Sequence, residues 1–175
     1  GMRMGVEQLV QLGHRKIGMV AWQDDATASY YRRAGFAQAM NEFGLSVSED
    51  LITYGFNEEA YGRRSFYQLY NLPEDKRPTA IICSSDLEAI GVMNAAEEHG
   101  VVVGKDLSVI GFDDVPMSQY LRPSLTTLRQ PIQEVADLLV SMLQTRIKNK
   151  PIKERQHLLP PELVVRSSTG PAPDS

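Results

Sequence analysis

The chain has 175 residues, of which 42% are hydrophobic and 23% are charged, a composition typical of a water-soluble globular domain with one sizeable core. Lys and Arg total 18 against 22 Asp and Glu, so the net charge of −4 argues against nucleic-acid binding by this chain itself. The single cysteine, Cys83, can form neither an internal disulfide nor a metal cage, which favours a reducing cytoplasm. No apolar stretch approaches the roughly 18 residues of a membrane span, and no export signal is visible.

Apolar strands and helices alternate along the first two thirds of the chain. Helical spacing of apolar residues predicts helices at 4–12, 30–43, 58–70 and 86–99. Short apolar runs predict strands at 17–22, 51–56, 79–83 and 107–112. Glycines that suit left-handed C-caps follow three of the helices, and Ser85 or Asp86 is expected to N-cap the fourth. This rhythm predicts an α/β fold with a doubly wound parallel sheet.

The rhythm changes after Pro123. Residues 125–128 form a short extended segment, and an amphipathic helix is expected at 132–147. A last strand is expected near 163–166, followed by a frayed tail from Gly170.

Ligands of doubly wound sheets bind in the crevice outside the carboxyl ends of the strands, so candidate ligand contacts are expected in the loops that follow the strands. Asp113 ends the fourth strand and could accept two hydroxyl hydrogen bonds from a polyol, although an aspartate there could also only cap its loop. Arg32 lies early in the second helix and could lean over the strand ends, whereas Arg33 points about 100° away. Either arginine could instead be a solvated surface cation. Ser85 could contact a ligand or only cap its helix.

Two aromatic residues end strands in the same region. Trp22 and Phe56 could each pack on the apolar face of a sugar ring, but core packing is the default for either ring.

Catalytic motifs are not apparent. The three histidines are scattered, no HExxH or phosphate-binding glycine loop occurs, and we expect no metal, cofactor or enzymatic activity. The pairs Asp24–Asp25 and Asp113–Asp114 allow a glycosidase hypothesis, but the sequence cannot fix their carboxyl separation. A receiver-like phosphoacceptor is also conceivable, since Asp24–Asp25 and Asp86 end strands one and three; the lysine expected at a final βα loop is missing.

Seven segments, taken in order, resemble the effector-binding region of LacI/GalR-type regulators. They are Gly5–Ile17, Arg32–Phe36, Pro78–Ile81, Ser85–Gly91, Asp106–Asp114, Pro123–Gln130 and Leu163–Thr169. Each segment alone is a weak signal, but together they extend over nearly the whole chain.

The resemblance implies a periplasmic-binding-protein-like fold with a small effector, usually a sugar or related metabolite, held between two lobes. It implies that Arg32 and Asp113 contact the effector, that Phe56 and Asn57 form the ring-stacking region, and that Ser85 makes a further polar contact where an Asn is often found. It also implies a cytoplasmic homodimer, with residues 88–98 as the candidate interface, and operator DNA bound only through an N-terminal domain outside this chain. An exported solute-binding protein of a sugar transporter is the alternative.

The family pattern also predicts how the chain is divided. A helix at 1–13 is assigned to a first lobe that lies mostly outside the chain, residues 14–128 to the second lobe, 129–156 to a first-lobe helix, 157–169 to the final strand and 170–175 to a tail. Because the helices at 4–12 and 132–147 each have an apolar face, we expect them to pack on each other or on a second chain.

Overall fold

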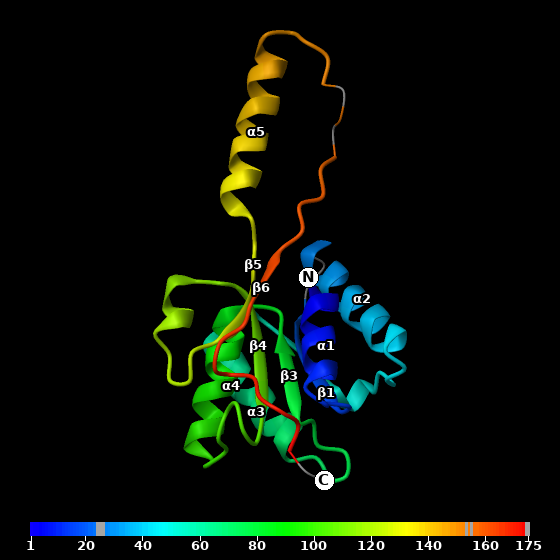
Figure 1. The fold of residues 1–175 in the computed structure, drawn as a ribbon, viewed down its shortest axis with the longest axis vertical. Coiled ribbons are helices and arrows are strands. Elements are labelled where there is room, and N and C mark those ends of the chain that lie inside the picture. Colours follow the sequence, from blue (N-terminus) through cyan, green and yellow to red (C-terminus); the bar gives the residue numbers. More distant parts are fainter. Residues whose placement is uncertain (24–26, 153, 155, 174–175) are drawn as a thin grey trace.

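The computed structural model describes residues 1–23, 27–152, 154 and 156–173, and these residues contain one six-stranded sheet in the order β2-β1-β3-β4-β5-β6 (Figure 1). The strands are β1 (Ile17–Trp22), β2 (Ile52–Gly55), β3 (Ala80–Cys83), β4 (Ser108–Asp113), β5 (Thr126–Arg129) and β6 (Glu162–Val164). The helices are α1 (Met2–Gln11), α2 (Thr27–Glu42), α3 (Glu59–Tyr70), α4 (Asp86–Glu98) and α5 (Ile132–Ile147), with short 3₁₀ turns η1 (Glu49–Leu51) and η2 (Pro116–Gln119). Strands β1 to β5 are parallel and β6 is antiparallel to β5, so the predicted α/β class is confirmed.

Helices cover both faces of the sheet, as a doubly wound fold requires. Alternate residues of each strand enter opposite cores, because successive side chains point to opposite faces. Val20 and Ile81 face a core with α3 and α4, whereas Met19 and Ile82 face a core with α1 and α2. Strand β1 lies between β2 and β3, so the connections leave β1 in opposite directions, and the carboxyl ends of the strands at such a point are where sheets of this type bind ligands.

Helix ends follow the predicted cap chemistry. Gly13, Gly44 and Gly100 have φ angles of 93°, 69° and 76°, the left-handed conformation expected after a helix. Ser85 is the N-cap of α4, and its Oγ accepts a hydrogen bond from the Glu88 amide at 3.3 Å.

Helix α1 belongs to the body of the domain, which corrects the prediction that it is part of another lobe. Val6 and Leu9 are fully buried in the core shared with α2 and the sheet. A Cβ on Gly5 would lie 3.4 Å from Ile82, so the helix lies directly on the strands. Its apolar face is therefore already covered within the chain.

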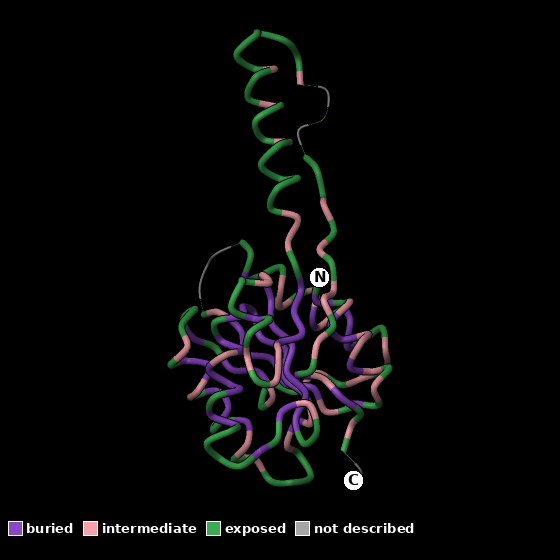
Figure 2. Tube along the Cα trace, turned by 60° about the vertical axis from the view of Figure 1, so that its left-hand side comes forward, coloured by how far each residue is buried: buried purple, intermediate pink, exposed green. Residues whose placement is uncertain are grey.

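Helix α5 projects away from the body together with residues 148–152 and 156–161 of the returning segment (Figures 1 and 2). None of its residues is buried, so it does not pack on α1 as expected. Its exposed large apolar side chains are Ile132, Val135, Leu139, Val140, Leu143 and Ile147. Within the described residues, no helix has both the length and the apolarity needed to cross a membrane.

The C-terminal segment is fixed further than predicted. The Val109 amide donates to the Ser168 carbonyl at 2.9 Å, and the Ala172 amide donates to the Leu12 carbonyl at 2.8 Å. The buried His14 ring contacts Ser108 Oγ and the Gly170 carbonyl at 2.9 and 3.1 Å. These bonds hold the chain in place to Ala172, where fraying was expected from Gly170.

Candidate functional site

Arg32 lies across the carboxyl ends of three strands. It stands in the second turn of α2, and its guanidinium carbon lies 4.6 Å from the Trp22 ring centroid and 3.9 Å from that of Phe112. One terminal nitrogen donates to the Ser84 carbonyl, and the other lies 3.7 Å from Asp113 Oδ1. The side chain is only 12% exposed. The predicted approach of Arg32 to the strand ends is therefore seen in the structure, and the stacked rings hold the guanidinium in one orientation.

Asp113 is held in a strained backbone conformation at the end of β4. Its φ angle is 118°, a region that residues with a side chain rarely adopt, at a cost on the order of 1–3 kcal/mol. Its Oδ1 accepts a 2.6 Å hydrogen bond from Gln130, and the side chain remains 28% exposed. Burial raises the pKa of Asp113, while Arg32 and Gln130 act in the opposite direction. Its carboxyl group is thus held in one orientation and remains partly accessible to a ligand.

The adjacent Asp114 has a different role. Its two oxygens accept hydrogen bonds from Arg129 at 2.6 Å and Arg166 at 2.7 Å, and its side chain is nearly buried. Burial alone would raise the pKa of Asp114, but the two arginines lower it. It ties β5 and the C-terminal segment together, so the Asp113–Asp114 pair does not supply two free carboxyl groups for glycoside hydrolysis.

Asp86 is the centre of a buried hydrogen-bond network. Its carboxylate accepts bonds from the Thr127 hydroxyl, from Ser118 Oγ at 2.6 Å and from the Val115 amide at 2.9 Å. The residue is fully buried. It fixes the loop after β4 and leaves no access for phosphorylation, which argues against the receiver-like alternative. The other acids of that alternative, Asp24 and Asp25, lie outside the described residues.

Ser85 and Asn57 are brought together by the structure. Ser85 Oγ donates to Asn57 Oδ1 at 2.6 Å while it also caps α4, so the loop after β2 is tied to the α4 N-terminus. Phe56 belongs to neither pair of contacts, and its side chain is 68% exposed. Of the five predicted site residues, Arg32 and Asp113 form one pair and Ser85 and Asn57 another.

Two polar residues of this region were not among the predicted site residues. Gln130 holds Asp113, as described above, and Glu88 is buried in the first turn of α4. A signal for Glu88 existed, because it shares a helix face with the core residues Val92 and Ala95 four and seven positions later.

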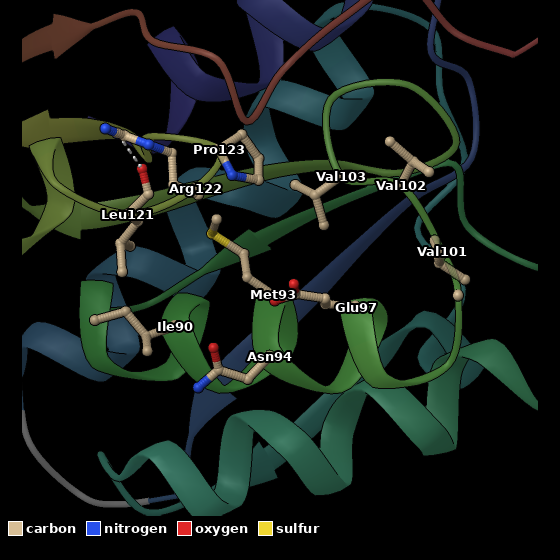
Figure 3. Close-up of a pocket in the computed structure, with 11 residues that line it drawn as sticks. Ile90, Met93, Asn94, Glu97, Val101, Val102, Val103, Leu121, Arg122 and Pro123 are labelled. Carbon is tan, nitrogen blue, oxygen red and sulfur yellow. Dashed lines mark hydrogen bonds between the residues drawn. The ribbon is translucent and has the colours of Figure 1, made fainter.

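Two pockets lie near these elements. One, of about 310 Å³, is lined by Arg32, Phe112 and parts of α1 and α2. The other, of about 480 Å³, lies over α4 and the loops 100–103 and 121–123, away from every predicted site residue (Figure 3). Among the described residues, no group of three His, Cys, Asp or Glu side chains could hold a metal ion.

Comparison with known proteins places the chain in a family. The profile of the periplasmic binding protein-like domain matches residues 6–169. The HTH-type transcriptional repressor PurR of Klebsiella pneumoniae is 38% identical over 165 residues, which are 94% of this chain and 48% of the repressor. CytR of Escherichia coli K12, also a repressor, is 34% identical over 169 residues, 96% of this chain and 49% of its own length.

Solved structures agree with the sequence relatives. A regulatory protein of the LacI family from Chloroflexus aggregans superposes with a TM-score of 0.93 at 38% identity, covering 97% of this chain and 60% of that one. The Lac repressor bound to ONPG superposes with a TM-score of 0.87 at 32% identity, covering 97% and 50%. The chain spans about half the length of the curated relatives it matches. The chain therefore belongs to the periplasmic binding protein-like domain family, in the form that makes up the effector-binding region of LacI/GalR-type regulators.

Proposed function

We propose that the chain senses a small polar effector at the carboxyl edge of the sheet, with Arg32 and Asp113 as the primary contacts, on behalf of a transcriptional repressor. The observation that carries this proposal is the strained backbone of Asp113 beside an arginine held between two rings. Strain of this kind is retained where the surrounding structure needs a side chain in one place, which is characteristic of ligand sites.

The effector we propose is a sugar or a related metabolite rich in hydroxyl groups. Asp113 accepts hydrogen bonds from hydroxyl donors and Arg32 donates to hydroxyl or carbonyl acceptors. Phe56 is exposed enough to stack on a ring. The neighbouring Asn57 is exposed and supplies a polar amide group, which the buried Ser85 holds in place by a hydrogen bond. The names of the relatives, all repressors, favour a regulator over the solute-binding protein of a transporter.

A second lobe would complete the site. We assign residues 129–156, which contain the uncovered helix α5, to that lobe, because an exposed apolar face of this size requires a partner. The greater length of the relatives is consistent with this assignment. Operator DNA would be bound by a further domain and not by this acidic chain.

A thermal-shift panel of sugars, nucleosides and nucleobases tests the proposal. A compound at 100 times its Kd should raise the Tm of the chain by about 5 °C. Asp113→Gly should retain the fold, because glycine adopts the positive φ angle without strain, and should lose the shift, because the carboxylate acceptor is gone.

Asp50→Ala serves as the matched control, since Asp50 is exposed in η1 before β2, away from the carboxyl ends of the strands. It should leave both the Tm and the ligand shift unchanged. Equal stabilisation of Asp113→Gly and the unmodified chain by the same compound would show that the effector binds elsewhere.

A further inference from the structure

Glu88, in the first turn of α4, is a buried acid whose carboxyl group has no hydrogen-bond partner among the described residues. Its exposed fraction is 0%. A charged carboxylate in such a place is unfavourable, so the neutral form is preferred. Burial raises the pKa of Glu88 to about 8, against the opposing influence of the nearby Ser84 and Ser85 groups and of Arg32. Around pH 7 the carboxyl group is therefore mostly protonated.

The tight contact between α3 and α4 explains why water does not reach this group. A Cβ on Gly62 of α3 would lie 2.0 Å from the Glu88 carbonyl oxygen, so the two helix backbones meet at this residue. The nearby hydroxyls of Tyr61 and Ser84 are also buried, without partners in the described part of the chain. A small polar region is thus enclosed below the strand ends.

Arg32 reaches the same place from the other side. Its guanidinium donates to the carbonyl of Ser84, the residue directly before the α4 N-cap. Side chains of a helix lean toward its N-terminus, which brings the Glu88 carboxyl toward that guanidinium. Arg32 and Glu88 each affect the pKa of the other. In the structure, however, the carboxylate that pairs with Arg32 is that of Asp113, at 3.7 Å.

Two titratable groups that face Glu88 change charge at a higher pH than Glu88, whereas the amine of Gly1 beside Arg32 changes charge at a lower pH. Cys83 on β3 and Tyr61 on α3 face it, and burial raises the pKa of both above their ordinary values of 9.0 and 10.0. Asp86 on the same helix is occupied by three donors. The Gly1 amine faces Arg32 from α1, and burial lowers its pKa from 8.0.

We propose that Glu88 is a positioning residue for the effector site, and that its neutral carboxyl keeps Arg32 paired with Asp113. When Glu88 loses its proton, two carboxylates compete for one guanidinium, and Arg32 is drawn toward the α4 N-terminus and away from the crevice. The link to effector affinity rests on the proposed function, whereas the movement of Arg32 does not.

The only tryptophan of the chain reports this movement directly. Trp22 stacks on Arg32 at 4.6 Å, so its fluorescence, excited at 295 nm, depends on the position of the guanidinium. In the unmodified chain we expect a fluorescence transition with a midpoint near pH 8 between pH 6 and 9.5. Glu88→Gln keeps the neutral shape and should lose the transition, and Glu88→Met provides a second neutral variant of similar size.

Glu74→Gln is the control, because Glu74 is an exposed glutamate in the loop before β3. It should retain the transition. A transition that persists unchanged in both Glu88 variants belongs to the Gly1 amine or another group and overturns the proposal.

The panel compound with the largest thermal shift then tests the link to the effector. Its Kd should increase about tenfold from pH 7 to pH 9 in the unmodified chain and stay constant in Glu88→Gln. An equal increase in both proteins overturns the effector link. A Glu88-dependent Trp22 transition in a chain that binds no panel compound would support the Arg32 movement and defeat the proposed function instead.

Discussion

Four acids at the strand ends show how environment, and not residue type, decides what a carboxylate does. Asp86 is buried and accepts three hydrogen bonds, and Asp114 is held by two arginines. Asp113 is strained and partly open, and Glu88 is buried without a partner in the described residues. The first two hold the fold together, whereas the last two retain unfavourable features, backbone strain at Asp113 and an unpaired buried carboxyl group at Glu88, which support the proposals made above for the site.

The raised pKa of Glu88 makes stability depend on pH. The folded-state pKa of about 8 exceeds the ordinary value of 4.5, so the contribution of Glu88 to stability is complete below pH 4.5 and is lost as the pH rises to about 8. The loss is on the order of 5 kcal/mol at most. Glu88→Gln does not titrate, so its free energy of unfolding relative to the unmodified chain should increase from pH 5 to pH 8 and then level off. Urea unfolding at several pH values measures this difference.

Glu74→Gln should follow the unmodified chain throughout, because its side chain is exposed. A constant difference between Glu88→Gln and the unmodified chain from pH 5 to pH 8 would contradict the buried neutral state of Glu88.

Helices α1 and α5 look alike as amphipathic sequences but are placed differently. The apolar face of α1 is buried against α2 and the sheet, whereas α5 has no buried residue and stands clear of the body (Figure 2). Periodicity identifies an apolar face but not the surface that covers it. The predicted boundaries of α5 were right, whereas packing on α1, one of the two partners predicted for it, was wrong; packing on a second chain stays a prediction.

Paired substitutions in these helices test the difference. Leu9→Ala removes a fully buried side chain and should lower the free energy of unfolding by about 3 kcal/mol. Leu139→Ala removes a side chain that is 60% exposed and should change it by less than about 0.5 kcal/mol. Urea unfolding of this chain measures both, and similar costs for the two variants would mean that α5 packs on the body in solution.

At the scale of the whole molecule, the 480 Å³ pocket lies over α4, within the surface at residues 88–98 that the family resemblance predicts for a homodimer (Figure 3). Ile90 and Met93 of α4 line it together with Val102, which is 54% exposed. A partly apolar, hollowed surface of this kind suits a second copy of the chain. None of the proposed effector contacts lines this pocket, so a dimer formed there would leave the proposed effector site open.

Val102→Glu should weaken self-association, because it places a charge in the apolar part of this surface. Sedimentation should show a dimer for the unmodified chain and at least a tenfold larger dimer Kd for the variant. Leu139→Glu on α5 is the control, since it separates association through α4 from association through the exposed apolar face of α5. A loss of the dimer only in Leu139→Glu would assign the interface to α5.

The sequence by itself determined the order and type of the elements. Apolar runs and helical spacing are local properties, and they predicted the parallel strands, the four flanking helices and the glycine C-caps to within a few residues. The sequence also allowed Arg32 to lie near Asp113, because the carboxyl ends of parallel strands meet at one edge of the sheet, but it left a solvated surface position for Arg32 equally open.

Only the tertiary structure decided which surface covers α1, which direction β6 takes and which acids are free. These features depend on residues far apart in the sequence. Asp86 accepts a hydrogen bond from Thr127, and Asp114 accepts one from Arg166. Glu88 is an example, because its spacing from Val92 and Ala95 places it on the core face of the helix, but only the packing of α3 on α4 shows how completely it is removed from water. The sequence shows which side chains can carry a charge, but the desolvation that shifts the pKa of such a side chain depends on the folded structure.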